Sequence, residues 1–368
     1  MAKQLTFSQR ATLFLGVCHF AIRLPWRLCT SFFTRERNKS WRQICTSVVL
    51  STFLTRRYRK VLLPVPESIT NYASWTATTG LEANVEELCN GAKLLWVGPK
   101  RLDKVMLYCH GGGYMISVGP NTFSWLRYMQ LELEKRDVNL GIAIVAYNLL
   151  PNAVFPSRLR EATDGFNHLI AAGVLPENII LGGDSAGGNL ALQLLSHILH
   201  PLPSIEIAHA TRLRGLLLVS PLVGVKRTFE MPFPQLEALH KRDYLPAEFH
   251  REVCLTFLKD VPEGDIAYAD GLAAPEEWFK PSDESVGRIL VTAGEWDFLE
   301  ENTRLFYEQH LKPLHRDVKL VVEKDGEHIA PILDFVLGED VDSVLTPLIV
   351  EWLADAFKAR PVAKLDRL

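Results

Sequence analysis

Beyond Pro66, short apolar runs alternate with longer segments in which apolar side chains recur every three or four residues. The short runs predict strands, several of them continuously apolar, as strands buried on both faces are. The predicted strands are residues 68–78, 93–97, 104–109, 142–147, 178–181, 215–219, 288–292 and 319–322. The longer segments predict helices at residues 123–135, 159–172, 190–199, 302–311 and 345–358. This alternation predicts an α/β fold with an eight-stranded, mostly parallel sheet covered by helices on both faces, whose first strands are antiparallel because their links are short.

A long interval between the strands that end near Val219 and begin near Arg288 interrupts the alternation. Because it contains a helix-like stretch at residues 247–258, we expect residues 225–285 to form a cap insertion. Residues 1–60 contain two further segments with amphipathic helical spacing, one within residues 1–34 and one at 41–60. We therefore expect an N-terminal helical arm (1–60) and an α/β domain (61–368), with the arm and the insertion capping the strand ends.

The composition suits one large domain, since 48% of the 368 residues are hydrophobic. The 6 cysteines form no Cys-x-x-Cys pair, which argues against a disulfide framework or a zinc site and favours a reducing, cytoplasmic location. The longest uncharged run of the arm, residues 11–22, is shorter than the roughly 20 residues of a spanning helix. No small-x-small cleavage site follows this run, so a signal peptide is not expected.

Charge is distributed unevenly along the chain, although the net charge is only −3. Residues 1–60 contain 12 Lys and Arg and one acid, Glu36, whereas the remainder contains 28 basic and 42 acidic residues. A basic arm on an acidic body leads to the hypothesis that the arm binds peripherally to an anionic cytoplasmic membrane face. The alternative is that its apolar stripes only close over the active site. We expect no nucleic-acid partner, and the oligomeric state stays open.

The sequence Gly183-Asp184-Ser185-Ala186-Gly187 lies between a β-branched apolar run and a helix-forming run. A Ser on a sharp strand-to-helix turn is typical of a nucleophile, because the turn exposes its hydroxyl and the helix N–H groups can bind an oxyanion. The alternative is a Gly-rich turn that holds a phosphate, but no Lys-Ser/Thr follows the glycines, which excludes a Walker A loop.

A Ser nucleophile needs a His base and an acid that orients the base, and in this architecture the chain order is Ser, acid, His. Asp297 follows the strand at 288–292, and His328 lies in the loop after the strand at 319–322. These residues are the predicted acid and base for Ser185. Other acids near Asp297 are Glu295, Glu300 and Glu301, and the other histidines downstream of Ser185 lie on predicted helices or in the insertion.

Three consecutive glycines, Gly111 to Gly113, follow the strand at 104–109 and leave backbone N–H groups uncovered. This pattern suits an oxyanion hole, with Gly112, Gly113 and Ala186 as the predicted N–H donors. His110 precedes the glycines and is expected to brace the loop rather than to act as the base.

Together, His110-Gly111-Gly112-Gly113 and Gly183-Asp184-Ser185-Ala186-Gly187-Gly188-Asn189 resemble the hormone-sensitive-lipase-like branch of the α/β-hydrolases. The segment Tyr147-Asn148-Leu149-Leu150-Pro151 is similar to that family's Tyr-Arg-Leu-Ala-Pro-Glu segment. The resemblance extends from about residue 70 to the C-terminus. It implies an α/β-hydrolase fold, serine carboxylesterase activity, no metal, no diffusible cofactor and a helical cap that includes N-terminal residues.

The chain departs from the family pattern at several positions. Asn148, Leu150 and Asn152 replace the usual Arg, Ala and Glu, Phe298 replaces a Pro after the acid, and Ala330-Pro331 follows the His where an aromatic is common. The Gly-Glu-Trp and His-x-Ala-Pro variants resemble hydrolases of fungal secondary-metabolite pathways, such as polyketide biosynthesis.

The expected reaction is hydrolysis of an ester or lactone of an apolar small molecule through an acyl-enzyme on Ser185. One alternative is transfer of the acyl group, from an ester or thioester, to a substrate hydroxyl, as in formation of a polyketide macrolactone. A second is a non-catalytic binding protein, like the gibberellin receptors that lack the His. The apolar cap residues predict a preference for apolar substrates of small to medium size: Leu13, Phe14, Phe20, Trp26, Phe32, Phe33, Trp41, Phe249 and Phe257.

Overall fold

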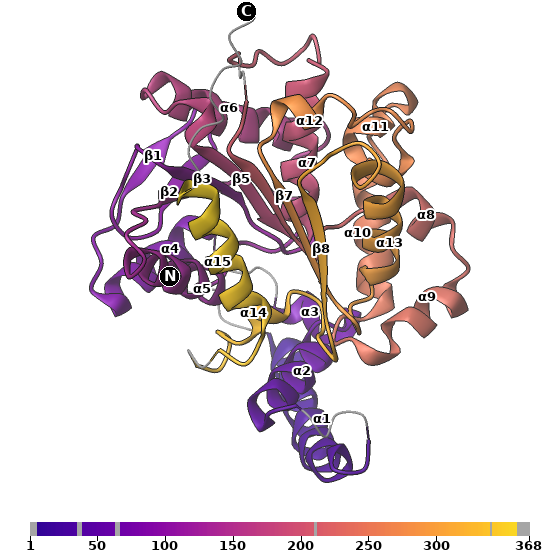
Figure 1. The fold of residues 1–368 in the computed structure, drawn as a ribbon. Helices are drawn as coiled ribbons and strands as arrows, with labels where there is room; N and C mark the ends of the chain where they lie inside the picture. The colour runs from indigo at the N-terminus through magenta and orange to yellow at the C-terminus, as the bar shows by residue number, and fades with distance from the viewer. Residues whose placement is uncertain (1–5, 35–38, 63–66, 210–211, 339–340, 359–368) are drawn as a thin grey trace, which may run out of the picture.

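The computed structural model describes residues 6–34, 39–62, 67–209, 212–338 and 341–358. Its centre is an eight-stranded sheet in the order β1-β2-β4-β3-β5-β6-β7-β8 (Figure 1). The strands are β1 (Val85–Glu87), β2 (Lys93–Trp96), β3 (Val105–Cys109), β4 (Gly141–Ala146), β5 (Ile179–Asp184), β6 (Gly215–Val219), β7 (Ile289–Gly294) and β8 (Val318–Glu323). β2 is antiparallel to β1 and β4, and all other neighbours are parallel. The predicted sheet is confirmed in strand number and direction.

One predicted strand is wrong. Residues 68–78 belong to helix α4 (Ser68–Thr79), and the first strand is the short β1 instead. The buried residues of α4, Tyr72, Trp75 and Thr76, are three and four positions apart, which is helical spacing. Gly80, at φ +69°, ends the helix in a left-handed conformation.

Helices cover both faces of the sheet. On one face α4, α5 (Pro120–Glu134) and α15 (Leu345–Lys358) enclose a core that includes Trp125 and Tyr108. On the other face α6 (Ser157–Ala171), α7 (Ala186–Leu199) and α13 (Glu300–Phe306) enclose a second core that includes Phe166 and Leu190. Because both faces are covered, the central strands are buried throughout, as their continuous apolar sequences predicted.

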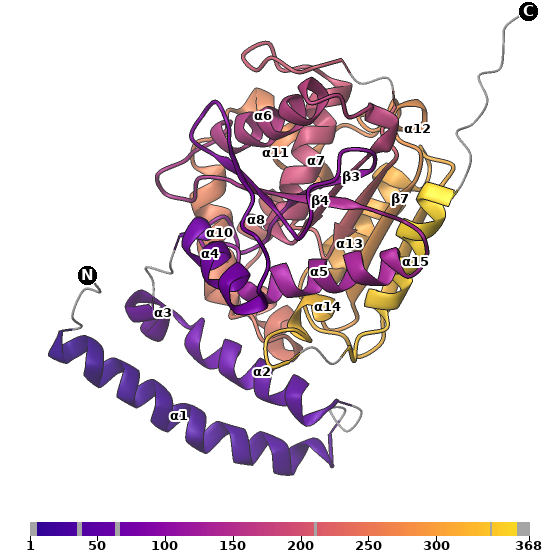
Figure 2. The ribbon, with the colours of Figure 1, turned by 90° about the vertical axis from the view of Figure 1, so that its left-hand side faces the viewer.

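The chain between β6 and β7 forms short helices, as expected for an insertion. They are α8 (Val225–Glu230), α9 (Phe233–Leu239), α10 (Ala247–Leu258), α11 (Ile266–Ala269) and α12 (Ser282–Ser285). In the N-terminal part, α1 (Phe7–Ser31) is followed by α2 (Trp41–Phe53) and α3 (Arg56–Leu62), so the predicted helix at 41–60 is divided near Leu54. Figure 2 shows α1 on the outside of α2, with α2 between α1 and the body. No helix among these described segments is both long and apolar enough to cross a bilayer.

Candidate active site

Ser185 lies at the turn between β5 and α7 with φ +51° and ψ −121°, a conformation that is uncommon for a residue with a side chain. The flanking glycines allow this turn. A Cβ on Gly183 would lie 2.3 Å from the Gly187 carbonyl oxygen, and a Cβ on Gly187 would lie 2.0 Å from the Cys109 carbonyl oxygen. The turn therefore requires glycine at both positions, as the sequence motif predicted.

The structure brings the predicted acid, base and nucleophile together. His328 Nε2 lies 2.9 Å from Ser185 Oγ, and His328 Nδ1 lies 3.0 Å from Asp297 Oδ1. His328 follows β8 and Asp297 follows β7, so parallel strand ends deliver both side chains to the same edge of the sheet. Both side chains are almost completely buried. Glu295 and Glu300 make other contacts, with the Asp325 N–H and with Arg304.

Charge at the site favours an imidazolium. Burial opposes the charged form of His328, but Asp297, Asp243 and Asp184 outweigh it, so the pKa of His328 is raised above its ordinary value of 6.5. Burial likewise opposes ionisation of Asp297, but His328 and hydrogen bonds from neighbouring groups lower its pKa. The Asp297 carboxylate thus stays ionised beside His328, which holds Nδ1 as a donor and leaves Nε2 facing Ser185.

A third acid, Asp243 of the insertion, was not predicted from the sequence. Its Oδ2 accepts the backbone N–H of His328 at 2.9 Å, and its Oδ1 accepts the N–H of Leu245 at 2.9 Å. Burial and repulsion by Asp297 raise the pKa of Asp243 to about 7. Nothing in the local sequence indicated this position, because Asp243 reaches His328 only through the folding of the insertion.

The predicted oxyanion loop lies beside Ser185. Gly112 and Gly113 have φ of +106° and +61°, and a Cβ on Gly113 would lie 2.7 Å from Val253 Cγ2. Within the described part of the chain, no group accepts a hydrogen bond from the N–H of Gly112, Gly113 or Ala186. These three donors are therefore available to a ligand.

Asp184, the residue before Ser185, holds this loop in place. Its Oδ1 accepts the Gly111 N–H at 2.9 Å and the Tyr108 hydroxyl at 2.8 Å. Burial raises the pKa of Asp184 to about 6 despite these hydrogen bonds. The sequence motif included Asp184, but its bracing role required the three-dimensional contact.

His110 packs against Tyr147 and does not contact Ser185 in any hydrogen bond of the described residues, which agrees with the expectation that it braces the loop. Its ring stacks on Tyr147 with centroids 4.3 Å apart, and burial lowers its pKa to about 4. The Tyr147 hydroxyl donates to the His110 carbonyl at 2.6 Å. Asn148, which replaces the family's Arg, donates from its backbone and side chain to Glu161 at 2.7 and 2.8 Å. The divergent segment therefore contacts the glycine loop through Tyr147, whereas Asn148 contacts Glu161 of α6.

A cavity of about 290 Å³ opens onto Ser185 and His328. Its walls are mainly apolar: Leu50, Leu54, Ile116, Leu222, Leu245, Phe249, Val253, Phe298, Ile329, Leu333 and Val336. Of the cap residues from which the substrate preference was predicted, Phe249 of the insertion lines this cavity. The arm's Phe14, Trp26, Phe32, Phe33 and Trp41 are exposed instead. The arm contributes Leu50 of α2 and Leu54, which follows that helix.

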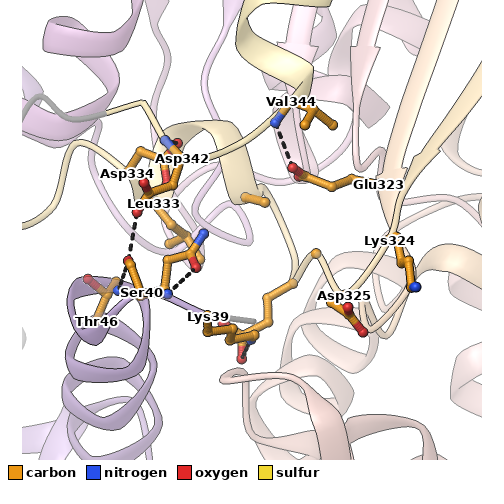
Figure 3. A pocket seen from close by; sticks show the side chains of 14 residues that line it. Lys39, Ser40, Thr46, Glu323, Lys324, Asp325, Leu333, Asp334, Asp342 and Val344 are labelled. Atoms are coloured by element: carbon orange, nitrogen blue, oxygen red, sulfur yellow. Dashed lines mark hydrogen bonds and ion pairs between the residues drawn. The ribbon is translucent and has the colours of Figure 1, made fainter. Parts of the chain in front are cut away.

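A second cavity, of about 450 Å³, lies where the start of α2 meets the body (Figure 3). Charged side chains dominate it, including Lys39, Glu323, Lys324 and Asp334. It does not include Ser185 or His328, so the apolar cavity is the candidate active site.

The chain is similar to proteins named as esterases and related enzymes. Tuliposide A-converting enzyme b2 of Tulipa gesneriana is 28% identical over 260 residues, which are 66% of this chain and 62% of that protein. Carboxylesterase/phospholipase LipF of Mycobacterium tuberculosis is 32% identical over 143 residues, 37% of each chain. A solved esterase of the bacterial hormone-sensitive lipase family superposes with a TM-score of 0.60 at 22% identity, covering 86% of this chain and 99% of the other.

The alignment therefore spans about 62% of the length of the tulip relatives. A family model described as the alpha/beta hydrolase fold matches residues 106–331, more than half of the chain and all of the predicted site. The predicted resemblance is thus confirmed for family and fold. The chain belongs to the α/β-hydrolase family.

Proposed function

We propose that this protein is a serine carboxylesterase that hydrolyses esters of apolar small molecules. The observation that carries the proposal is the continuous hydrogen-bonded line from Asp297 through His328 to Ser185, at 3.0 and 2.9 Å, beside an apolar cavity. Relatives named as esterases support the reaction class.

In this mechanism His328 Nε2 takes the proton from Ser185 Oγ as the oxygen attacks the ester carbonyl carbon. The N–H groups of Gly112, Gly113 and Ala186 bind the oxyanion, and His328 then protonates the leaving alcohol. Water, deprotonated by His328, releases the acid from Ser185. Asp297 holds the imidazole tautomer and stabilises the imidazolium throughout.

The cavity supports a small, apolar acyl group. Its volume of about 290 Å³ is near the lower end of typical small-molecule sites, which start at roughly 300 Å³. Apolar side chains from α2, from the insertion and from the loop after β8 surround Ser185. We therefore expect short to medium acyl chains without charge. A role in secondary metabolism stays a prediction from the sequence.

The pairing of His328 with Ser185 favours catalysis over the binding-protein alternative, because a receptor needs no base aimed at a Ser hydroxyl. Transfer of the acyl group to a hydroxyl would use the same acyl-enzyme. The products therefore distinguish it from hydrolysis.

The test is labelling with a fluorophosphonate and turnover of uncharged p-nitrophenyl esters by wild type and Ser185→Ala. We expect Ser185→Ala to lose labelling and about three or more orders of magnitude in kcat, since it removes the nucleophile. Ser282→Ala is the matched control, because Ser282 is also buried and its hydroxyl has no partner among the described residues. Unchanged turnover in folded Ser185→Ala would refute the proposal.

A further inference from the structure

Helix α1 presents its more apolar face to solvent. The exposed positions recur three, four and seven residues apart and include Phe7, Ala11, Phe14, Leu15, Val17, Ile22 and Trp26. Phe14, Ile22 and Trp26 are exposed by 68%, 73% and 72%. Of the 17 large hydrophobic residues that are exposed in the described chain, 9 lie between Phe7 and Trp41. Six of these nine lie on α1 and the other three follow it, so the exposed hydrophobic surface is concentrated at this helix and its C-terminal end.

The opposite face of α1 packs on α2 and α3 and mixes small and polar groups with the half-buried Leu13, Phe20 and Leu24. Gly16 is buried so closely that a Cβ there would lie 2.9 Å from Phe53. Arg23 donates to the Thr52 hydroxyl at 3.0 Å, and Ser31 is buried. A surface helix normally packs its apolar stripe inward and its polar face outward. In α1 the exposed face is the more apolar of the two, which indicates that this face meets an apolar environment.

Contacts of the other two helices hold α1 in this orientation. Lys39, just before α2, forms a buried ion pair with Glu327 at 3.0 Å. Ser40, the next residue, donates to Asp342 at 2.6 Å (Figure 3). At the other end of the layer formed by helices α1 to α3, Arg59 of α3 pairs with Glu252 of α10. With α2 and α3 fixed to the body, α1 lies on the far side of α2 and its outer face points away from the sheet (Figures 1 and 2).

The positive charge of the arm indicates what kind of partner covers the outer face of α1. Residues 1–60 contain 12 basic residues and one acid, and of these Arg10, Arg56 and Arg57 are exposed. A second copy of the chain would bring two such arms together, with repulsion between like charges. An anionic lipid surface offers both the apolar phase and the complementary charge, and Trp26 suits the headgroup level.

We propose that α1 lies in the plane of an anionic phospholipid bilayer, with Phe14, Ile22, Trp26 and their neighbours on the outer face inserted below the headgroups. The helix then binds one leaflet and does not cross the membrane. This inference concerns a surface remote from Ser185 and does not depend on esterase activity.

The test is flotation of the full chain with vesicles of phosphatidylcholine plus phosphatidylserine, at low and high salt. The test variant carries Phe14→Glu, Ile22→Glu and Trp26→Glu. The matched control carries Leu175→Glu and Val344→Glu, which replace exposed apolar residues outside the arm. We expect wild type and control to float at low salt, and the test variant to bind vesicles at least about tenfold more weakly.

Thermal unfolding of each variant checks the fold, and Trp26→Ala provides a milder change with the same expected direction. Wild-type binding should weaken as salt rises and in vesicles of phosphatidylcholine alone, because charge contributes to it. No flotation of wild type at low salt would overturn the proposal, as would equal flotation of wild type and test variant. A wild-type dimer that the test variant converts to a monomer, with no flotation of either, would show that a second copy covers the face.

Discussion

Asp243→Asn tests whether Asp243 of the insertion raises the pKa of His328, the proposed base. The substitution keeps the shape of the side chain, but it removes the negative charge next to His328 and leaves one oxygen in place of two. The carboxylate accepts two backbone N–H groups, those of His328 and Leu245, so the amide leaves one of them without an acceptor. An unsatisfied buried donor costs about 1–3 kcal/mol, which lowers the free energy of unfolding without unfolding the protein.

The more specific effect is on the pH profile. His328 must be neutral to accept the Ser185 proton, so kcat/KM falls as pH drops through the raised pKa of His328, above 6.5. Above its own pKa of about 7, Asp243 carries a negative charge that favours the imidazolium, so removing this charge lowers the pKa of His328 in that pH range. The acid limb should therefore move to lower pH in Asp243→Asn. An interaction of about 0.7 kcal/mol would move it by about half a pH unit.

The assay is kcat/KM against pH for a neutral ester, with thermal unfolding of each protein. Asp270→Asn is the matched control, because Asp270 is also buried in the insertion and accepts backbone N–H groups from Gly224, Lys226 and Leu272. Asp270→Asn should lower the thermal stability without moving the acid limb of the pH profile. An unmoved limb in folded Asp243→Asn, or an equal shift in Asp270→Asn, would contradict the reasoning.

Two further predictions concern the acid and the nucleophile turn. Asp297→Asn should lower kcat by about four orders of magnitude, because a neutral amide favours the wrong His328 tautomer. Glu295→Gln or Glu300→Gln should leave kcat within about threefold. Steady-state kinetics measure these values, and a larger loss in either Glu variant would reassign the acid. Gly187→Ala should lower the free energy of unfolding by about 1–3 kcal/mol or more, because the new Cβ would lie 2.0 Å from the Cys109 carbonyl oxygen. Gly264→Ala should be neutral, because Gly264 has open space around it. Equal thermal midpoints of the two variants would contradict this prediction.

The sequence predicted most of the sheet because the central strands are continuous apolar runs that only a covered sheet can bury. It failed at residues 68–78, where Ile69, Tyr72 and Trp75 are residue types common in strands although their spacing is helical. It also missed β1, since three residues with two glutamates carry no strand pattern. Local composition was misleading where tertiary packing decides the conformation.

The site was predictable where chain order and strand ends determine position. Ser185, Asp297 and His328 each follow a strand of the parallel sheet, so their meeting at one edge follows from topology. Asp243 was not predictable, because it depends on the path of the insertion. The periodicity of α1 predicted a helix but not the direction of its apolar face, and that direction depends on how α2 and α3 attach to the body.

The buried pair of Lys39 and Glu327 joins the arm to the residue next to His328. Glu327 also accepts from Ser47 of α2, so two groups of the N-terminal layer hold the peptide that positions the base. Removing one partner of a buried ion pair typically costs about 3–5 kcal/mol. A shortened protein that begins after α3 would therefore lose turnover for a reason unrelated to lipid. The proposed anchoring and the proposed chemistry therefore depend on the same contacts between the arm and the body, and substitutions on the outer surface of α1 are the way to separate them.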